Sequence, residues 1–179
     1  MPSAFGHALF ASALGASFRA RGAMIAAAAF CAVAPDFDVV GFRLGIPYEV
    51  PLGHRGFTHS LVFAVLLGGA MALLLRALLR ESARPPLARA FTLLTLATAS
   101  HGLLDALTDG GLGVAFFSPF DHTRYFLPWR PIAVSPLGVG NFFSVRGLEV
   151  ERSEALWIGP PALALWLVGR LARRKPRPG

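Results

Sequence analysis

Histidine and aspartate side chains fall in four short clusters along this chain, and both residue types bind divalent metal ions. The clusters are His7, Asp36 with Asp38, His54 with His59, and His101 with Asp105. His101 and Asp105 are four residues apart, so on a helix they project from one face and can share an ion. Imidazole and carboxylate ligands without a thiolate suit zinc, with manganese or iron as alternatives. The pattern therefore predicts a site for one or more divalent ions.

The composition indicates that these clusters lie in a membrane protein. Of the 179 residues, 54% are hydrophobic and only 15% are charged, and the mean hydropathy is +0.55. Soluble domains average about 45–50% apolar and about 25% charged residues, so a soluble globular, disordered or coiled-coil class is excluded. The single cysteine, Cys31, lies in an alanine-rich run and is expected in the core. We expect one membrane-embedded domain over residues 1–172, followed by a basic tail over residues 173–179.

Five apolar runs supply the helices that must position the clusters, at 4–16, 22–34, 61–79, 87–107 and 155–169. A helix needs about 20 apolar residues to cross a bilayer, which the third and fourth runs satisfy and the last satisfies marginally. The first two runs are short, and the second meets Pro35-Asp36, so they predict a helical hairpin that is re-entrant or packed against the other helices. Apolar residues come in blocks rather than alternating, which argues against strands.

The expected fold is thus an all-α integral membrane helical bundle. It has about three transmembrane helices, a short N-terminal helical hairpin and a long structured loop over Asp109–Arg152, which is rich in glycine, proline and aromatic residues. Pro160-Pro161 should kink the last helix or lie in its first turn. Thr58 is the expected N-cap of the helix that begins near Leu61.

The basic residues predict the orientation of this bundle. One end receives Arg19, Arg21, the 76–89 connection and the tail, which together hold eleven of the seventeen basic residues and one acid, Glu81. The positive-inside rule places that end in the cytoplasm of a multi-pass inner-membrane protein. The net charge of +7 then marks topology and contact with anionic lipid, and no nucleic-acid partner is expected.

The opposite, outward end receives all five histidines and all five aspartates. Each cluster alone has a simpler interpretation. His7 can make a polar contact at a helix terminus, and Asp36 with Asp38 can form a helix stop. His101 with Asp105 can be an interhelical hydrogen-bonded pair or a proton relay. Because hydropathy alone brings all four clusters to one end, a shared metal site is the stronger hypothesis.

A loop of arginines and aromatic residues, 118–132, follows this end directly. Its aromatic residues can form a belt at the membrane interface. In the functional alternative, Arg124 and Arg130 together with Arg55 hold a phosphate or another anion. Asp121 and His122 would then be additional ligands or acid–base groups.

These elements, in this order, resemble the YdjM/YbcI-type family of membrane-bound metal-dependent hydrolases. The resemblance spans about residues 5–140 and rests on His7, Ala34-Pro35-Asp36-Phe37-Asp38, His54-Arg55-Gly56-Phe57-Thr58-His59-Ser60, His101-Gly102-Leu103-Leu104-Asp105, Ser118-Pro119-Phe120 and Trp129-Arg130-Pro131-Ile132. The family in turn looks distantly similar to the all-α, zinc-dependent phospholipase C and P1-type nuclease fold. That similarity implies a zinc cluster held by helical His-Xaa3-Asp/Glu pairs and phosphoester hydrolysis.

The leading hypothesis is a membrane-embedded, metal-dependent hydrolase that cleaves a phosphoester of a lipid or lipid-like substrate with a metal-activated water. Its expected metal ligands are His7, Asp36, Asp38, His54, His59, His101 and Asp105. Asp36 or Asp38 can instead be the general base, while Arg55 or Arg130 stabilises charge on the phosphoryl oxygens. One alternative is a metal or proton transporter that uses the same residues. The other is a structural membrane protein whose helical bundle is stabilised by a bound metal ion.

Overall fold

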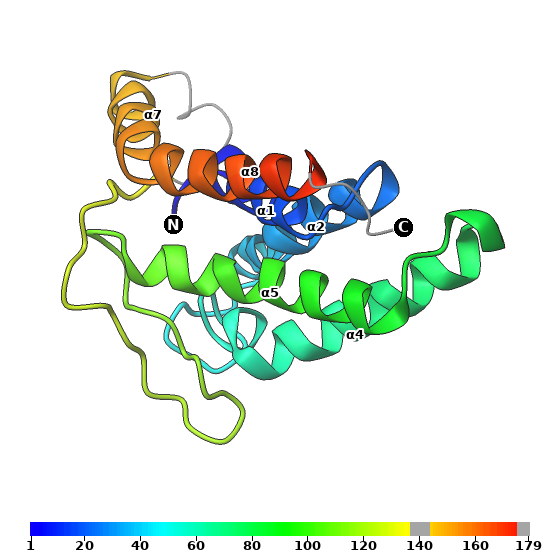
Figure 1. Ribbon diagram of the computed structural model, residues 1–179. Coiled ribbons are helices and arrows are strands. Elements are labelled where there is room, and N and C mark those ends of the chain that lie inside the picture. The colour runs from blue at the N-terminus through cyan, green and yellow to red at the C-terminus, as the bar shows by residue number, and fades with distance from the viewer. Residues whose placement is uncertain (137–143, 175–179) are drawn as a thin grey trace.

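The computed structural model describes residues 1–136 and 144–174, and it is all-helical. The elements, labelled in Figure 1 where there is room, are α1 (Ala4–Ser17), α2 (Ala23–Val33), the 3-10 turn η1 (Ala34–Val39), α3 (Val40–Arg43), η2 (Phe57–His59), α4 (Leu61–Leu78), η3 (Glu81–Ala83), α5 (Leu87–Ala106), α7 (Val145–Trp157) and α8 (Gly159–Arg174). Within the described residues the only β pairing is two isolated bridges. The predicted all-α fold is confirmed.

Three helical segments are long and apolar enough to cross a membrane: Ala23–Arg43, Leu61–Leu78 and Leu87–Ala106. The first differs from the expected short run, because the chain stays helical beyond Pro35. Proline lies in the first turn of η1, where its missing N–H is not needed. Helices α7 and α8 form a fourth candidate span that is bent by 44°. Pro160 and Pro161 lie in the first turn of α8, which is one of the two expected arrangements.

The expected loop over Asp109–Arg152 is only partly a loop. Residues 107–136 are irregular and carry the bridges Thr108–Ile132 and Val114–Tyr125, whereas α7 begins at Val145. The hydropathy pattern missed α7 because this helix is rich in charged residues. Ser144 caps it by accepting a hydrogen bond from the backbone N–H of Gly147. The part of the predicted loop over 137–143 lies outside the described residues.

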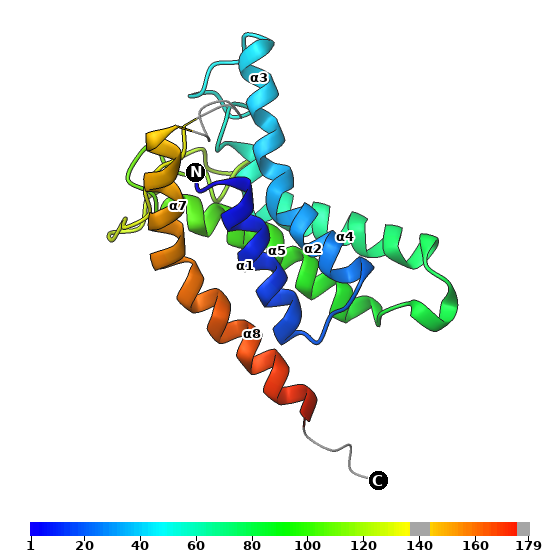
Figure 2. The same cartoon turned by 90° about the horizontal axis from the view of Figure 1, so that it is seen from above.

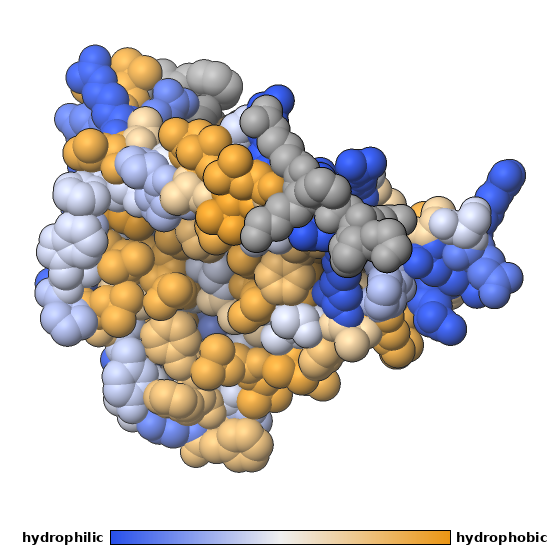
Figure 3. Space-filling model, viewed as in Figure 1, coloured by the Kyte–Doolittle hydropathy of each residue, from blue (hydrophilic) through white to orange (hydrophobic). Residues whose placement is uncertain are grey.

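Small side chains let the helices approach closely. Seen from above, α1 lies between α8 and α2 (Figure 2), and it contacts both. α4 packs along α5, and α2 packs against α5. Alanines dominate the buried cluster between these helices, and close backbone contact is the usual basis of helix association in membranes. Hydrophobic residues cover much of the surface around α5 and α8 in Figure 3, consistent with a lipid-facing exterior.

Two adjacent glycines on α4 test this close packing. A Cβ atom at Gly68 would lie 2.6 Å from the backbone nitrogen of Thr95 on α5 and would also collide with the Thr95 hydroxyl, whereas one at Gly69 would lie 3.6 Å from Phe91. Gly68→Ala should therefore lower stability by about 1–3 kcal/mol through overpacking. Gly69→Ala should be neutral or slightly stabilising, since alanine favours helix. Thermal unfolding in detergent checks both, and equal effects would contradict the α4–α5 contact.

Candidate metal centre

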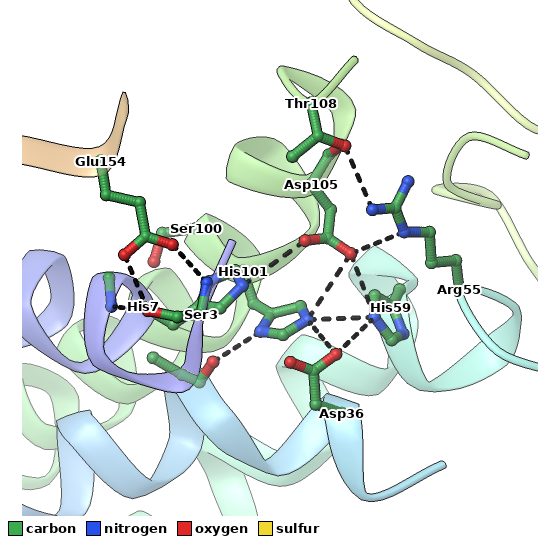
Figure 4. A network of polar contacts seen from close by, with 12 residues as sticks. Ser3, His7, Asp36, Arg55, His59, Ser100, His101, Asp105, Thr108 and Glu154 are labelled. Atoms are coloured by element: carbon green, nitrogen blue, oxygen red, sulfur yellow. Dashed lines mark hydrogen bonds and ion pairs between the residues drawn. The ribbon is translucent and has the colours of Figure 1, made fainter. Parts of the chain in front are cut away.

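Three elements bring four donor side chains together inside the bundle (Figure 4). Asp36 lies on η1, His59 on η2, and His101 with Asp105 on the last turns of α5. Nε2 of His59 and Nε2 of His101 are 3.0 Å apart. Oδ1 of Asp36 lies 3.3 Å from Nε2 of His101 and 3.6 Å from Nε2 of His59. Oδ2 of Asp105 lies 3.9 Å from Nε2 of His101 and 3.5 Å from Nε2 of His59. Ligands of a tetrahedral zinc ion are about 3.3–3.6 Å apart, so the spacing fits one ion.

Hydrogen bonds on the far side of each imidazole aim both Nε2 atoms at this centre. His101 Nδ1 lies 2.6 Å from the carbonyl oxygen of Ala32, so Nδ1 carries the proton and donates it. His59 Nδ1 lies 3.3 Å from Oδ2 of Asp38 and 3.0 Å from Oγ1 of Thr58. Such outer contacts are the usual way that proteins fix the tautomer of a metal-binding histidine. In the neutral rings, two Nε2 lone pairs then face each other, and a cation between them removes the conflict.

Because the side chains of this cluster are buried, their negative charge favours a nearby cation. His59, His101 and Asp105 are buried, as is Asp36 at 7% exposed. Asp105 forms an ion pair with Arg55, whereas Asp36 has neither a hydrogen bond nor an arginine partner among the described residues. Uncompensated buried charge is costly, and membrane segments hold it mainly where it is paired or functional. Burial disfavours a charged His59, yet the carboxylates of Asp105, Asp36 and Asp38 raise its pKa well above the ordinary value. The arrangement therefore favours a positive charge at the centre, which a proton or a metal ion can supply.

Asp38 and His54 form a second group around His59. Asp38 Oδ1 lies 2.6 Å from His54 Nδ1, and its Oδ2 accepts a hydrogen bond of 2.6 Å from the Thr58 hydroxyl. Asp38, His54 and His59 could themselves hold an ion. However, both oxygens of Asp38 already have hydrogen-bond partners, whereas those of Asp36 have no hydrogen bond among the described residues. This geometry favours Asp38 as the group that orients His59.

His7, fully buried on α1, lies beside the centre. Its ring stacks on His101 with centroids 3.8 Å apart, and its Nε2 lies 3.4 Å from Oδ1 of Asp105. Neither ring nitrogen of His7 makes a hydrogen bond within the described residues. Glu154 on α7 holds the start of this helix, because it accepts hydrogen bonds from the backbone N–H and the hydroxyl of Ser3. His7 is thus placed beside Oδ1 of Asp105, the oxygen that does not face His59 and His101, and can contact this oxygen or an ion bound to it.

Arg55 is directed inward and contacts the centre through Asp105. It is 1% exposed, and its Nε lies 2.9 Å from Asp105 Oδ2. Nη1 donates to the carbonyl of Gly110 at 2.9 Å, and Nη2 donates to the Thr108 hydroxyl at 3.1 Å. The backbone of Arg55 has φ +59°, a conformation that is uncommon outside glycine and often found at functional sites. The guanidinium thereby fixes Asp105 and balances part of the charge of the two buried carboxylates.

The other predicted anion and acid–base residues lie in the 118–132 loop and make no hydrogen bond or ion pair with the four central side chains among the described residues. Arg124 donates to the carbonyls of His54 and Tyr48 at 2.9 and 2.7 Å, so it holds the segment that carries His54. Arg130 is exposed with its guanidinium 4.7 Å from the centre of the Phe126 ring. Asp121 accepts a hydrogen bond from the backbone of Thr123, and His122 lies 3.4 Å from the Ser118 hydroxyl.

Several site contacts were missed by the sequence argument. Thr58 is not the N-cap of α4; Ser60 caps it, and the Thr58 hydroxyl serves Asp38 instead. Thr108 and Glu154 were not singled out, although Thr108 follows Asp105 within one turn. The contact between His101 and the carbonyl of Ala32 could not be predicted from residue types, because every residue has a backbone carbonyl.

Metal-binding measurements on variants of Asp38 and Asp36 can distinguish the roles of these two residues. Asp38→Asn keeps the four central donors but weakens the contact that orients His59, so zinc affinity should fall about 10–100-fold with the stoichiometry unchanged. Asp36→Asn removes a ligand and should abolish stoichiometric binding. Calorimetric titration of chelator-treated protein in detergent measures both, with His122→Ala as the control. Loss of a complete ion equivalent in Asp38→Asn would instead show that the second group binds its own ion.

Comparisons with known proteins show the family to which the chain belongs. A family model described as YdjM inner membrane protein matches residues 1–176. The chain is 40% identical over 134 residues to the inner membrane protein YbcI of Escherichia coli strain K12, and the match covers 75% of each chain. No solved structure matches significantly. The chain therefore belongs to the YdjM inner membrane protein family.

Proposed function

We propose that this protein is a membrane-embedded hydrolase that cleaves a phosphoester of a lipid or lipid-like substrate with the help of a divalent metal ion. The observation that carries the proposal is the pair of Nε2 atoms of His59 and His101, 3.0 Å apart between two buried carboxylates. This arrangement fits a metal ion, and its place inside a membrane bundle favours a substrate that comes from the bilayer.

The donor set favours zinc and a catalytic rather than a purely structural ion. Two imidazoles and two carboxylates surround the centre, and the single cysteine of the chain, Cys31, belongs to the apolar core. Structural zinc sites are built mostly from cysteine and histidine, whereas catalytic sites commonly combine histidine with a carboxylate. Manganese or iron remain alternatives for the same ligands. His7, beside Oδ1 of Asp105, offers a ligand for a second ion.

Each residue around the centre has a separate role in this proposal. A bound divalent ion supplies Lewis acidity and lowers the pKa of water toward neutrality. Asp36 is the most exposed of the four central residues. With its Oδ1 as a metal ligand, its Oδ2, which has no hydrogen bond among the described residues, can accept a proton from an attacking water. Asp38 and Thr58 hold the imidazole of His59, and Arg55 holds Asp105. Arg130, exposed on the 118–132 loop, remains the proposed contact for the phosphate of the substrate.

Removal of one imidazole tests the proposal. Purified wild-type protein should contain zinc or a related ion in stoichiometric amount by elemental analysis, and His101→Ala should lose it because both Nε2 donors are needed. A screen that measures phosphate or headgroup release from phospholipids should find an activity absent from His101→Ala. His122→Ala, which changes an exposed histidine of the same protein, should keep metal and activity. A metal-free wild-type protein would refute the proposal.

Transport of the metal or of protons is the second candidate function, because Asp36, His101 and Asp105 lie within candidate membrane spans. Proteoliposomes distinguish the two. Metal or proton flux that is lost in His59→Ala, without any hydrolysis, would favour the transporter. If chelation melts the fold and the metal-loaded protein shows neither hydrolysis nor flux, the ion is structural.

A further inference from the structure

The end of the bundle opposite the candidate metal centre contains a polar pocket of about 400 Å³. It is formed where α1 connects to α2, where α4 ends and where α5 begins, and these connections lie at the same end in Figure 1. The lining residues are Arg19, Ala20, Arg21, Gly22, Ala23, Met24, Leu79, Ala83, Pro85 and Arg89. None of these residues belongs to the site described above.

Three arginines and no acidic residue line this pocket. Arg19 donates one hydrogen bond of 2.7 Å to the carbonyl of Ala172, and Arg89 donates one to the carbonyl of Phe18. The guanidinium of Arg21 is exposed and has no hydrogen bond or ion pair within the part of the chain that the structure describes. A guanidinium carries five N–H donors, so most of this donor capacity remains for a ligand.

The depth of the pocket in the membrane is set by the helices that form it. Ala23 begins one candidate span, Leu79 directly follows the end of another, and Arg89 lies in the first turn of the third. The pocket therefore lies where the chain leaves the apolar layer, at the level of the phospholipid phosphates. Leu78 and Leu87, the span ends beside it, are exposed apolar residues that can meet the acyl chains.

We propose that this pocket binds the phosphate of an anionic phospholipid headgroup. Arginine forms bidentate, charge-assisted hydrogen bonds with phosphate oxygens, and three guanidinium groups around one pocket offer more donors than a single phosphate can accept. The membrane level and the adjacent apolar wall of Met24, Leu79 and Pro85 favour a lipid phosphate over a soluble one. Basic pockets between transmembrane helices commonly bind such headgroups.

Native mass spectrometry of delipidated protein in detergent tests the site. We expect wild-type protein to retain phosphatidylglycerol over phosphatidylcholine with the same acyl chains. The double variant Arg19→Gln/Arg21→Gln should lose affinity for phosphatidylglycerol by about tenfold or more. Arg76→Gln/Arg80→Gln removes the same charge from the same end at two exposed residues that do not line the pocket, so it should bind as wild type does. Thermal unfolding without lipid verifies that both variants fold.

Three results would overturn the proposal. Equal retention of both lipids would show that the pocket does not select a charged headgroup. Equal losses in the two double variants would assign binding to diffuse surface charge. Displacement of phosphatidylglycerol by an equal concentration of inorganic phosphate would show a soluble-phosphate site instead. None of these readouts depends on the metal centre or on its activity.

Discussion

The structure depends on the close approach of two imidazole nitrogens in a water-poor interior. Nε2 of His59 and Nε2 of His101 face each other at 3.0 Å, and buried carboxylates flank them. Without a further cation, the neutral rings would direct two lone pairs at each other, and Arg55 would compensate only part of the charge of the two carboxylates. The surrounding contacts preserve this arrangement. The carbonyl of Ala32 and the carboxylate of Asp38 fix the rings, and Arg55 fixes Asp105. The fold thus keeps excess negative charge between Asp36 and Asp105, which a proton or a bound cation can neutralise.

The bundle can hold such a centre because its helices touch through small side chains. Alanines fill the interior between α1, α2, α4 and α5, and Gly68 lies against Thr95. This packing leaves little room for helices to shift, so donors from η1, η2 and α5 keep a defined spacing. The 3-10 turn η1 is equally important. It continues the second helix past Pro35 and places Asp36 and Asp38 on either side of His59.

Much of the site could be predicted from the sequence, because its signals are local or follow from alternating topology. The spacing of His101 and Asp105 gives a shared helix face, and hydropathy places Asp36 and His59 at the same end. Other features depend on tertiary contacts. Periodicity does not say that Asp38 bonds His54 and Thr58, or that Arg55 points inward with φ +59°. The charged helix α7 escaped detection because a hydropathy argument finds only apolar helices.

The link between Glu154 and Ser3 has a consequence for the order in which the protein matures. These residues are 151 positions apart, yet the carboxylate of Glu154 holds the first turn of the helix that carries His7. Because α1 precedes α7 along the chain, α1 is synthesised before the residue that holds its first turn. The helix that carries His7 therefore gains this support only after α7 has been made. The contact of His7 with Asp105 thus depends on two segments that are far apart in the sequence, and not on α1 alone.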